Sequence, residues 1–199
     1  MGGFRSILVA HRDPDVTSYM PSIETDRLLL RMMQADDLDN LASLLSDPDV
    51  VKYVGDGKPA NREEAARALE SIIKHWDTHG FGRWAVVDKS TGEFIGFGGL
   101  RSLFGTPEVV YHLTKAHWGM GYATELARAA LRFGFQERRF DRIVAITKPQ
   151  NSRSIHVMDK LGLRFEKHAR YYDIDVVQYE INREEFTAGE GAFKVLADE

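Results

Sequence analysis

A strand that turns into a helix through two closely spaced glycines is the feature that most constrains how this chain can fold. Residues 108–113 are rich in β-branched and aromatic side chains and are predicted to form a strand. From Ala123 onward, apolar residues recur at helical spacing, which predicts a helix. Gly119 and Gly121 stand between the two elements. The chain must therefore pass from strand to helix within a few residues.

The glycine turn has the composition of an anion-binding site. Glycine tolerates dihedral angles that other residues avoid, and its missing Cβ lets a ligand approach the backbone. The first turn of a helix presents unpaired N–H groups and the positive end of the helix dipole. Residues 118–124 are therefore predicted to hold a phosphate group. A plain tight connection is the alternative, because glycines commonly punctuate a chain at turns.

Two familiar nucleotide-binding patterns do not fit this turn. It lacks the lysine followed by serine or threonine that a P-loop requires. It also lacks the third glycine, and the acidic residue about twenty positions later, of a dinucleotide-binding fingerprint. The predicted ligand is therefore a different phosphate compound.

Composition limits the classes of protein to which the chain can belong. With 199 residues and 43% hydrophobic content, it is predicted to form a single domain. A net charge of -4 argues against nucleic acid as a partner, because binding a phosphate backbone requires a concentrated basic surface. The absence of cysteine excludes disulfides, thiolate metal sites and a cysteine nucleophile.

The sequence contains neither a membrane-spanning apolar run nor the apolar centre of a signal peptide. A soluble, cytoplasmic protein with no membrane partner is therefore expected. Residues 1–22 are interpreted as a flexible leader. Residues 1–6 also match the short pattern for N-myristoylation, which has meaning only in a cell that contains the transferase.

The remaining elements follow from periodicity and turn residues. A helix is predicted to begin at Asp36 or Asp37 and to stop at Asp47 and Pro48, and the helix after the glycine turn to end near Arg138. Further helices are predicted over residues 62–75 and 152–161, and strands over residues 23–31, 84–88, 93–100, 142–147, 164–172 and 174–181. Early helices, a meander and two strand-helix units indicate an α+β or mixed-sheet domain.

His75 and His79 are four residues apart, a spacing that places two imidazoles on one face of a helix. The pattern lacks the glutamate of a zinc-protease helix and an obvious third ligand. No metal site is predicted, and the two histidines are interpreted as residues of a helix end before Gly80.

Residues 151–163 form the second informative stretch, with an asparagine, two serines and a closing Leu-Gly-Leu. Together with the glycine turn and with residues 24–31, this stretch resembles the GNAT superfamily of coenzyme A-dependent N-acyltransferases. Within the superfamily it is similar to the branch of ribosomal-protein N-terminal alanine acetyltransferases. The resemblance covers roughly residues 23–185. It implies one GNAT domain over 23–185, followed by a C-terminal tail over 186–199.

The resemblance implies a mostly antiparallel central sheet with flanking helices and a splayed pair of central strands. It implies that the backbone of the glycine turn holds the coenzyme A pyrophosphate. It further implies that pantetheine pairs with the backbone around Leu113 and contacts Asn151. The superfamily often has arginine or glutamine where this chain has Trp118, so binding here is expected to rest on backbone groups. The implied cofactor-binding residues are Leu113, Trp118, Gly119, Met120, Gly121, Tyr122, Ala123, Thr124 and Asn151.

The implied reaction needs a base, because an amine acceptor is protonated at neutral pH and must lose a proton before it attacks a thioester. The resemblance assigns the base to Glu108, whose pKa burial would raise. A solvated carboxylate at a strand edge is the alternative reading of Glu108. His112 is the competing base, although a single histidine on a half-buried strand is more often a packing residue.

The departing thiolate needs a proton or a hydrogen bond. Many members of the superfamily have a tyrosine seven residues after the asparagine, but this chain has Met158 there. Ser154 matches a serine placed near the sulfur in the similar branch, and we read it as a hydrogen-bond donor to that sulfur. The alternative is that Ser154 caps N–H groups in the first turn of its helix.

The sequence therefore predicts an acetyltransferase that moves an acetyl group from acetyl-CoA to a primary amine by direct transfer, without a metal. A larger donor such as succinyl-CoA is one alternative, and Arg101 or His112 would then serve as a cation near the acyl group. A binding module that senses acyl-CoA without catalysis is another. The acceptor is left open between a protein N-terminus and a small amine, and the closing strands can pair across a homodimer or finish the sheet.

Overall fold

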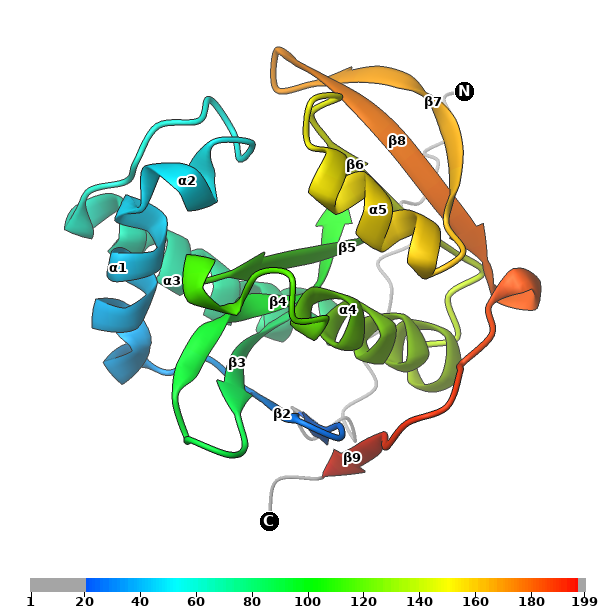
Figure 1. The fold of residues 1–199 in the computed structure, drawn as a ribbon, viewed down its shortest axis with the longest axis horizontal. Coiled ribbons are helices and arrows are strands. Elements are labelled where there is room, and N and C mark those ends of the chain that lie inside the picture. The colour runs from blue at the N-terminus through cyan, green and yellow to red at the C-terminus, as the bar shows by residue number, and fades with distance from the viewer. Residues whose placement is uncertain (1–20, 197–199) are drawn as a thin grey trace, which may run out of the picture.

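The computed structural model describes residues 21–196, in which nine strands form one sheet in the order β7-β8-β6-β5-β4-β3-β2-β1-β9 (Figure 1). All neighbouring strands are antiparallel except β5 and β6, which are parallel. The strands are β1 (Ser22–Glu24), β2 (Leu28–Arg31), β3 (Arg83–Asp88), β4 (Phe94–Leu103), β5 (Thr106–Leu113), β6 (Arg142–Thr147), β7 (Arg164–Tyr171), β8 (Ile174–Asn182) and β9 (Lys194–Leu196).

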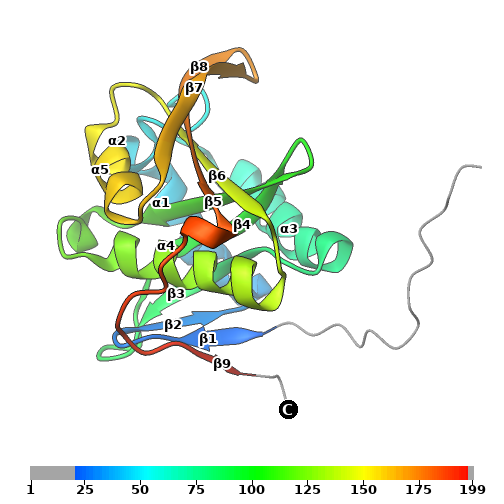
Figure 2. The same cartoon turned by 90° about the vertical axis from the view of Figure 1, so that its right-hand side faces the viewer.

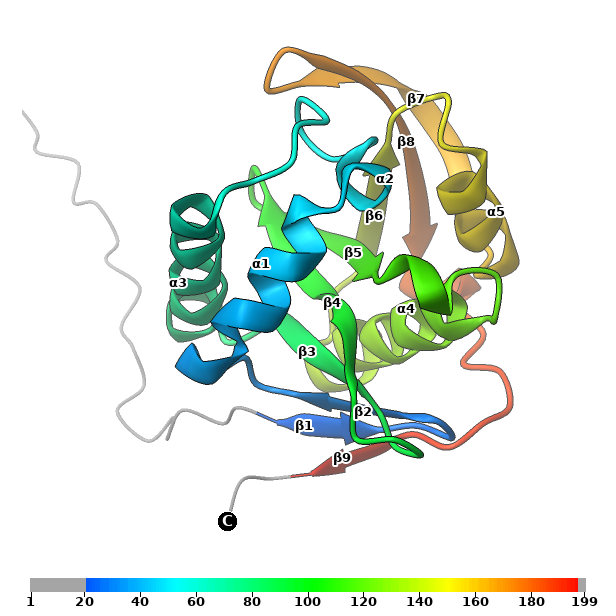
Figure 3. The ribbon, with the colours of Figure 1, turned by 60° about the vertical axis from the view of Figure 1, so that its left-hand side comes forward.

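Five α-helices flank the sheet (Figure 3). They are α1 (Leu38–Ser46), α2 (Pro48–Val51), α3 (Arg62–His79), α4 (Tyr122–Arg132) and α5 (Ser152–Lys160). Short 3₁₀ segments are η1 (Ala35–Asp37), η2 (Lys115–His117) and η4 (Arg183–Glu185), and a π-helical turn η3 (Phe133–Glu137) extends α4.

The helices divide between the two faces of the sheet, and each face has its own apolar cluster. The larger cluster packs the apolar stripe of α4 against β3, β4 and β5, with Trp84 and Leu126 fully buried. The smaller cluster packs α1 and α3 against the other face, around Leu41 and Phe97. Figure 3 shows β3 and β4 between α1 and α3 on one side and α4 on the other. Both helical layers exist because each helix buries one apolar stripe.

The parallel strands β5 and β6 meet at a single point. Their one pair of aligned residues is Glu108 and Val144. Beyond Glu108, β5 runs on toward the start of α4, while β6 runs toward the start of α5 (Figures 1 and 2). The two strands therefore diverge from Glu108 onward, which confirms the splayed strand pair that the resemblance implied.

The structure confirms the predicted fold class and most of the predicted elements. The strand over 142–147 has the predicted bounds, and the helices that begin at Arg62 and Ser152 start where predicted. The helix after the glycine turn begins at Tyr122, one residue before the first residue of the predicted helical spacing. The helix predicted over 62–75 continues to His79, where Gly80 ends it with a positive φ of 68°. The chain after Asp47 forms the short helix α2, because the Asp47 side chain accepts a hydrogen bond from the Asp49 N–H and Pro48 suits a first helical turn.

The single strand predicted over 23–31 is wrong, because two short strands, β1 and β2, occupy this range. Between them the chain makes a tight turn, in which the Thr25 N–H donates to the Leu28 carbonyl oxygen at 2.9 Å. No strand or helix was predicted after residue 181, and residues 186–199 were expected to form a C-terminal tail, yet β9 pairs with β1 at the edge of the sheet. The leader and the myristoylation pattern lie mainly outside the described residues.

Candidate active site

The glycine turn is open to solvent on the side where α4 begins. Gly119 and Gly121 have φ angles of 77° and 85°, a left-handed conformation that side chains other than glycine rarely adopt. A Cβ atom added to Gly119 would meet nothing within 4 Å. Gly121 is the residue that precedes α4, and no side chain caps this helix end. The first-turn N–H groups of Tyr122, Ala123 and Thr124 thus have no side-chain acceptor from the capping position.

A cluster of hydrogen bonds fastens the turn to the start of β2. The Glu125 carboxylate accepts from the Thr25 hydroxyl at 2.7 Å and from the Arg27 backbone N–H at 2.9 Å. The Arg27 guanidinium donates to the same carboxylate at 2.7 Å and to the Met120 carbonyl oxygen at 2.9 Å. This Thr25–Arg27–Glu125 clamp was not predicted, because residues about a hundred positions apart carry no local signal of their contact.

Trp118 and Arg153 also act at the turn, the first as a hydrogen-bond donor and the second as a cation. The Trp118 indole donates to the Leu113 carbonyl oxygen at 2.8 Å, which ties the turn to the end of β5. The Arg153 guanidinium, at the start of α5, lies 5.0 Å from the centre of the Trp118 ring. Arg153 brings positive charge to the open glycine turn, which favours an anionic ligand there, whereas the charge of Arg27 is already paired with Glu125.

Glu108 is buried where β5 and β6 diverge, with only 1% of its surface exposed. The reading of Glu108 as a solvated carboxylate is therefore wrong. Its carboxylate accepts a hydrogen bond from Arg101 Nε at 2.6 Å. Burial raises the pKa of Glu108 above its usual range, and the positive charge of Arg101 opposes this effect without cancelling it.

His112 lies on the same strand and is held in its neutral form. Its ring stacks on Phe97 with 4.7 Å between the ring centres. Burial, helped by the nearby charges of Arg83 and Arg101, lowers the pKa of His112 to about 4. Such an imidazole binds a proton weakly at neutral pH, which makes it the poorer base of the two candidates.

Ser154, on α5, contacts Tyr111 on β5, one of the two diverging strands. The Tyr111 hydroxyl and Ser154 Oγ are 2.9 Å apart, and the Tyr111 hydroxyl also lies 3.2 Å from the Ser154 carbonyl oxygen as a donor. Burial raises the pKa of Tyr111 to about 12, so this phenol stays protonated. Nothing in the sequence singled out Tyr111, because it is one of several apolar and aromatic residues in the predicted strand over residues 108–113.

Asn151 provides the cap of α5. Its side-chain oxygen accepts from the Ser154 backbone N–H at 3.3 Å, and its amide group donates to Thr147 Oγ1 at 3.0 Å. The capping role considered for the Ser154 hydroxyl is therefore filled by Asn151. The Ser154 hydroxyl is paired with Tyr111 instead.

His75 has both ring nitrogens occupied by backbone groups. Its Nδ1 lies 2.8 Å from the Phe81 carbonyl oxygen, and its Nε2 accepts from the Ser102 N–H at 3.0 Å. This arrangement makes His75 a packing residue that joins α3 to β4. Within residues 21–196, no group of three or more candidate metal ligands is gathered.

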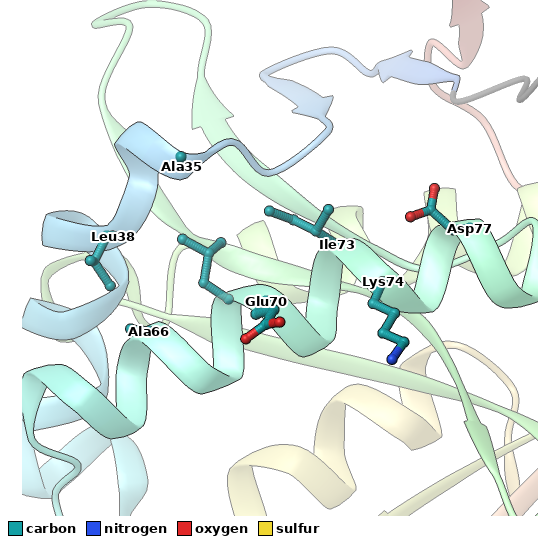
Figure 4. A pocket seen from close by; sticks show the side chains of 8 residues that line it. Ala35, Leu38, Ala66, Glu70, Ile73, Lys74 and Asp77 are labelled. Carbon is teal, nitrogen blue, oxygen red and sulfur yellow. The ribbon is translucent and has the colours of Figure 1, made fainter.

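A shallow groove of about 340 Å³ lies between η1, α1 and α3, away from the glycine turn (Figure 4). Leu38, Leu69 and Ile73 give it an apolar floor, while Glu70 and Lys74 stand at its side. None of the residues that were predicted to form the site lines this groove. Across the described part of the chain, no helix combines the length and the apolarity that crossing a membrane requires.

Comparison with known proteins identifies the family. Residues 27–164 match the family described as the acetyltransferase (GNAT) domain. The chain is 31% identical over 177 residues to the uncharacterized N-acetyltransferase p20 of Bacillus licheniformis, a match that covers 84% of this chain and 99% of p20. The crystal structure of a GNAT-family acetyltransferase from Bacillus anthracis superposes with a TM-score of 0.73 at 27% identity and covers 82% of this chain and 99% of that one.

The similar branch also appears among the structural neighbours. The ribosomal-protein-S5-alanine acetyltransferase of Vibrio fischeri superposes with a TM-score of 0.69 at 19% identity, covering 83% of this chain and 98% of that one. At this identity the likeness concerns the fold. The family match over residues 27–164 and the likeness to p20 show more than the fold. This chain belongs to the GNAT acetyltransferase family and is an acyl-CoA-dependent N-acyltransferase.

Proposed function

We propose that the protein transfers the acetyl group of acetyl-CoA to a primary amine by direct attack of the amine on the thioester. The observation that carries this proposal is the burial of Glu108 at the point where β5 and β6 diverge. A buried carboxylate with a raised pKa, set beside a strand edge that is free of its neighbour, suits a base that accepts a proton from an amine.

The donor would bind across the open glycine turn and the diverging strands. The N–H groups from Trp118 to Thr124 suit the pyrophosphate, because they lie at a helix start and no side chain caps them. Arg153 adds positive charge beside that position. The backbone near Leu113 and the amide of Asn151 would then contact the pantetheine arm.

Glu108 and Ser154 would serve different atoms in the reaction. Glu108 would take the proton that the amine loses as its nitrogen bonds to the acetyl carbon. The carbon–sulfur bond breaks in the same reaction, and the departing sulfur gains a hydrogen bond from Ser154. Tyr111 supports this role, because its hydroxyl lies 2.9 Å from Ser154 Oγ and can donate to it.

An amine-dependent assay tests the proposal. Purified protein is incubated with acetyl-CoA and a panel of primary amines, among them peptides with free N-termini, diamines and amino acids, and release of the free thiol is followed. We expect release that depends on an amine and an acetylated amine in the products. A protein that binds acetyl-CoA but acetylates none of these amines would favour the sensor reading instead.

A further inference from the structure

Arg83 is a charged residue for which the reaction described above has no use. It lies at the start of β3, and its carbonyl oxygen accepts a hydrogen bond from the Trp76 indole at 3.0 Å. Its Nε atom is buried and has no hydrogen-bond partner among residues 21–196. Burial lowers the pKa of Arg83 to about 10, which still leaves the guanidinium charged at neutral pH. Buried polar atoms of this kind normally have a partner.

The surroundings of Arg83 carry an excess of positive charge. Arg83 lies opposite Gly99 on β4, and Arg101 follows two residues later on the same face of β4, opposite Glu108 on β5. Repulsion from Arg101 lowers the pKa of Arg83, and the Glu108 carboxylate acts in the opposite direction. Glu108 already pairs with Arg101 at 2.6 Å. Two guanidinium charges thus face one carboxylate.

The nearby histidines do not change this balance. The pKa values of His75 and His112 are both lowered to about 4, chiefly by burial, so both imidazoles are neutral at pH 7. An uncompensated charge in a partly buried place is costly, and an anion beside it relieves that cost.

The cluster is accessible from outside. The Arg101 side chain is 33% exposed, and Arg83 and His112 are partly exposed as well. Arg83 and Arg101 therefore both reach solvent, whereas the Glu108 carboxylate is buried. A ligand that binds Arg101 lies beside Glu108, because Arg101 Nε is 2.6 Å from the Glu108 carboxylate.

We propose that Arg83 and Arg101 bind a carboxylate group of a substrate while Glu108 acts on the reacting amine. This inference rests on the proposed function of Glu108. Guanidinium groups bind carboxylates through paired, charge-assisted hydrogen bonds, so two of them make a selective subsite. The carboxylate has two chemical sources: an acceptor amine that also carries a carboxylate, or a dicarboxylic acyl group on the donor.

The acceptor source is tested with matched pairs of amines. Glycine, β-alanine and γ-aminobutyrate are each compared with the corresponding amide, with acetyl-CoA as the donor. The amine of glycinamide is less basic than that of glycine, so more of it is unprotonated and ready to react at neutral pH. A preference for glycine therefore cannot come from a larger supply of free amine. We expect kcat/KM for at least one acid to exceed that of its amide by about tenfold, as one charged hydrogen bond predicts.

The donor source is tested with succinyl-CoA against acetyl-CoA, with an uncharged amine as the acceptor. A preference of similar size for succinyl-CoA would place the carboxylate on the acyl group. In either case, Arg83→Gln should remove the preference and Arg83→Lys should keep part of it. The control is Arg67→Gln, which removes the same charge from an exposed ion pair on α3 and should leave the preference unchanged.

The outcomes separate this inference from the proposed function. If no amine is acylated by either donor, the proposed function fails. If amines are acylated but neither a carboxylate-bearing acceptor nor succinyl-CoA is preferred, the subsite is overturned while the acetyltransferase assignment stands. The wild-type comparisons decide this even if an Arg83 variant does not fold, and a preference that Arg83→Gln leaves intact in a folded protein would also overturn the subsite.

Discussion

Glu108 experiences two opposing effects, and their balance sets the pH at which it can act. Burial raises its pKa, and Arg101 at 2.6 Å limits the rise. The carboxyl group can accept a proton only when it is ionised, so activity should increase as the pH rises through the pKa of Glu108. The acidic limb of the kcat/KM profile should therefore lie above the usual range of a glutamate.

Replacing the carboxylate tests this role at the level of a single residue. Glu108→Gln keeps the size of the side chain but removes the base, so kcat should fall by about a hundredfold or more. The acidic limb should disappear, while acetyl-CoA affinity stays near its wild-type value. Glu93→Gln, on an exposed turn, is the control and should change neither. A Glu108→Gln enzyme with a wild-type pH profile would transfer the role of base to water or His112.

The Tyr111–Ser154 pair permits a second test at this scale. Ser154→Ala should lower kcat by about tenfold through loss of a hydrogen bond to the sulfur, with donor affinity unchanged. Tyr111→Phe should act in the same direction, and the double variant should be little worse than either single one, because the two hydroxyls act as a unit. Helix α5 should persist in Ser154→Ala, since Asn151 supplies its cap. Loss of thermal stability without loss of rate would contradict the assignment.

At the scale of elements, the site depends on contacts between segments that are distant in sequence. Glu125 on α4 holds the start of β2 through Thr25 and Arg27. This clamp fixes the first turn of α4, whose N–H groups form the glycine turn's open edge. The same contacts explain why residues 24–28 bend into a turn between β1 and β2, which alternation of polar and apolar residues could not reveal.

Glu125→Ala tests the clamp. It removes the acceptor of the buried Thr25 hydroxyl and the ion pair of Arg27, so the free energy of unfolding should fall by about 1–3 kcal/mol. Acetyl-CoA should also bind more weakly, because the first turn of α4 loses its anchor. Glu70→Ala, on the exposed face of α3, should cost far less in the same urea titrations. Equal costs for the two variants would mean that the clamp contributes nothing of its own.

Local signals in the sequence were sufficient for the glycine turn, for the strand over 142–147 and for the helices that start at Arg62 and Ser152. Each of these depends on side chains within one turn or one strand of each other. The pairing of Glu108 with Arg101, the clamp at Glu125 and the strand β9 could not be predicted, since each joins segments that only the folded chain brings together. Tyr111 shows the same limit, because its partner Ser154 lies on another element.

At the scale of the whole molecule, two partly buried histidines link stability to pH. The pKa values of His75 and His112 fall from 6.5 to about 4 in the folded state. Between these values the unfolded chain binds more protons than the folded one, so the free energy of unfolding rises with pH across this range. Below about pH 4 both states are protonated and the histidines contribute no further change. Glu108 has the opposite effect. Its pKa is raised in the folded state, so the folded chain binds the extra proton and the free energy of unfolding falls as the pH rises through its titration.

Urea unfolding at a series of pH values checks this linkage. The midpoint should fall as the pH is lowered from about 6.5 toward 5, a window above the range in which ordinary carboxylates titrate. His75→Gln and His112→Gln should each flatten the dependence by roughly half if the two contributions are equal. A midpoint that is constant over this window both in the wild-type protein and in Glu108→Gln, which lacks the opposing carboxyl group, would show that neither histidine is held neutral by the fold.

The central claim is that the open glycine turn binds an acyl-CoA donor, and calorimetric titration with acetyl-CoA tests it most directly. Gly119→Glu should abolish binding by placing a negative charge in the turn, where an added Cβ atom meets no other atom within 4 Å. Gly92→Glu is the matched control, since Gly92 has a similar φ of 73° and an equally open position in the turn before β4. We predict saturable binding of one acetyl-CoA per chain in the wild type and in Gly92→Glu, and none in folded Gly119→Glu. Binding that survives Gly119→Glu unchanged, or no binding to the wild-type protein, would contradict the account.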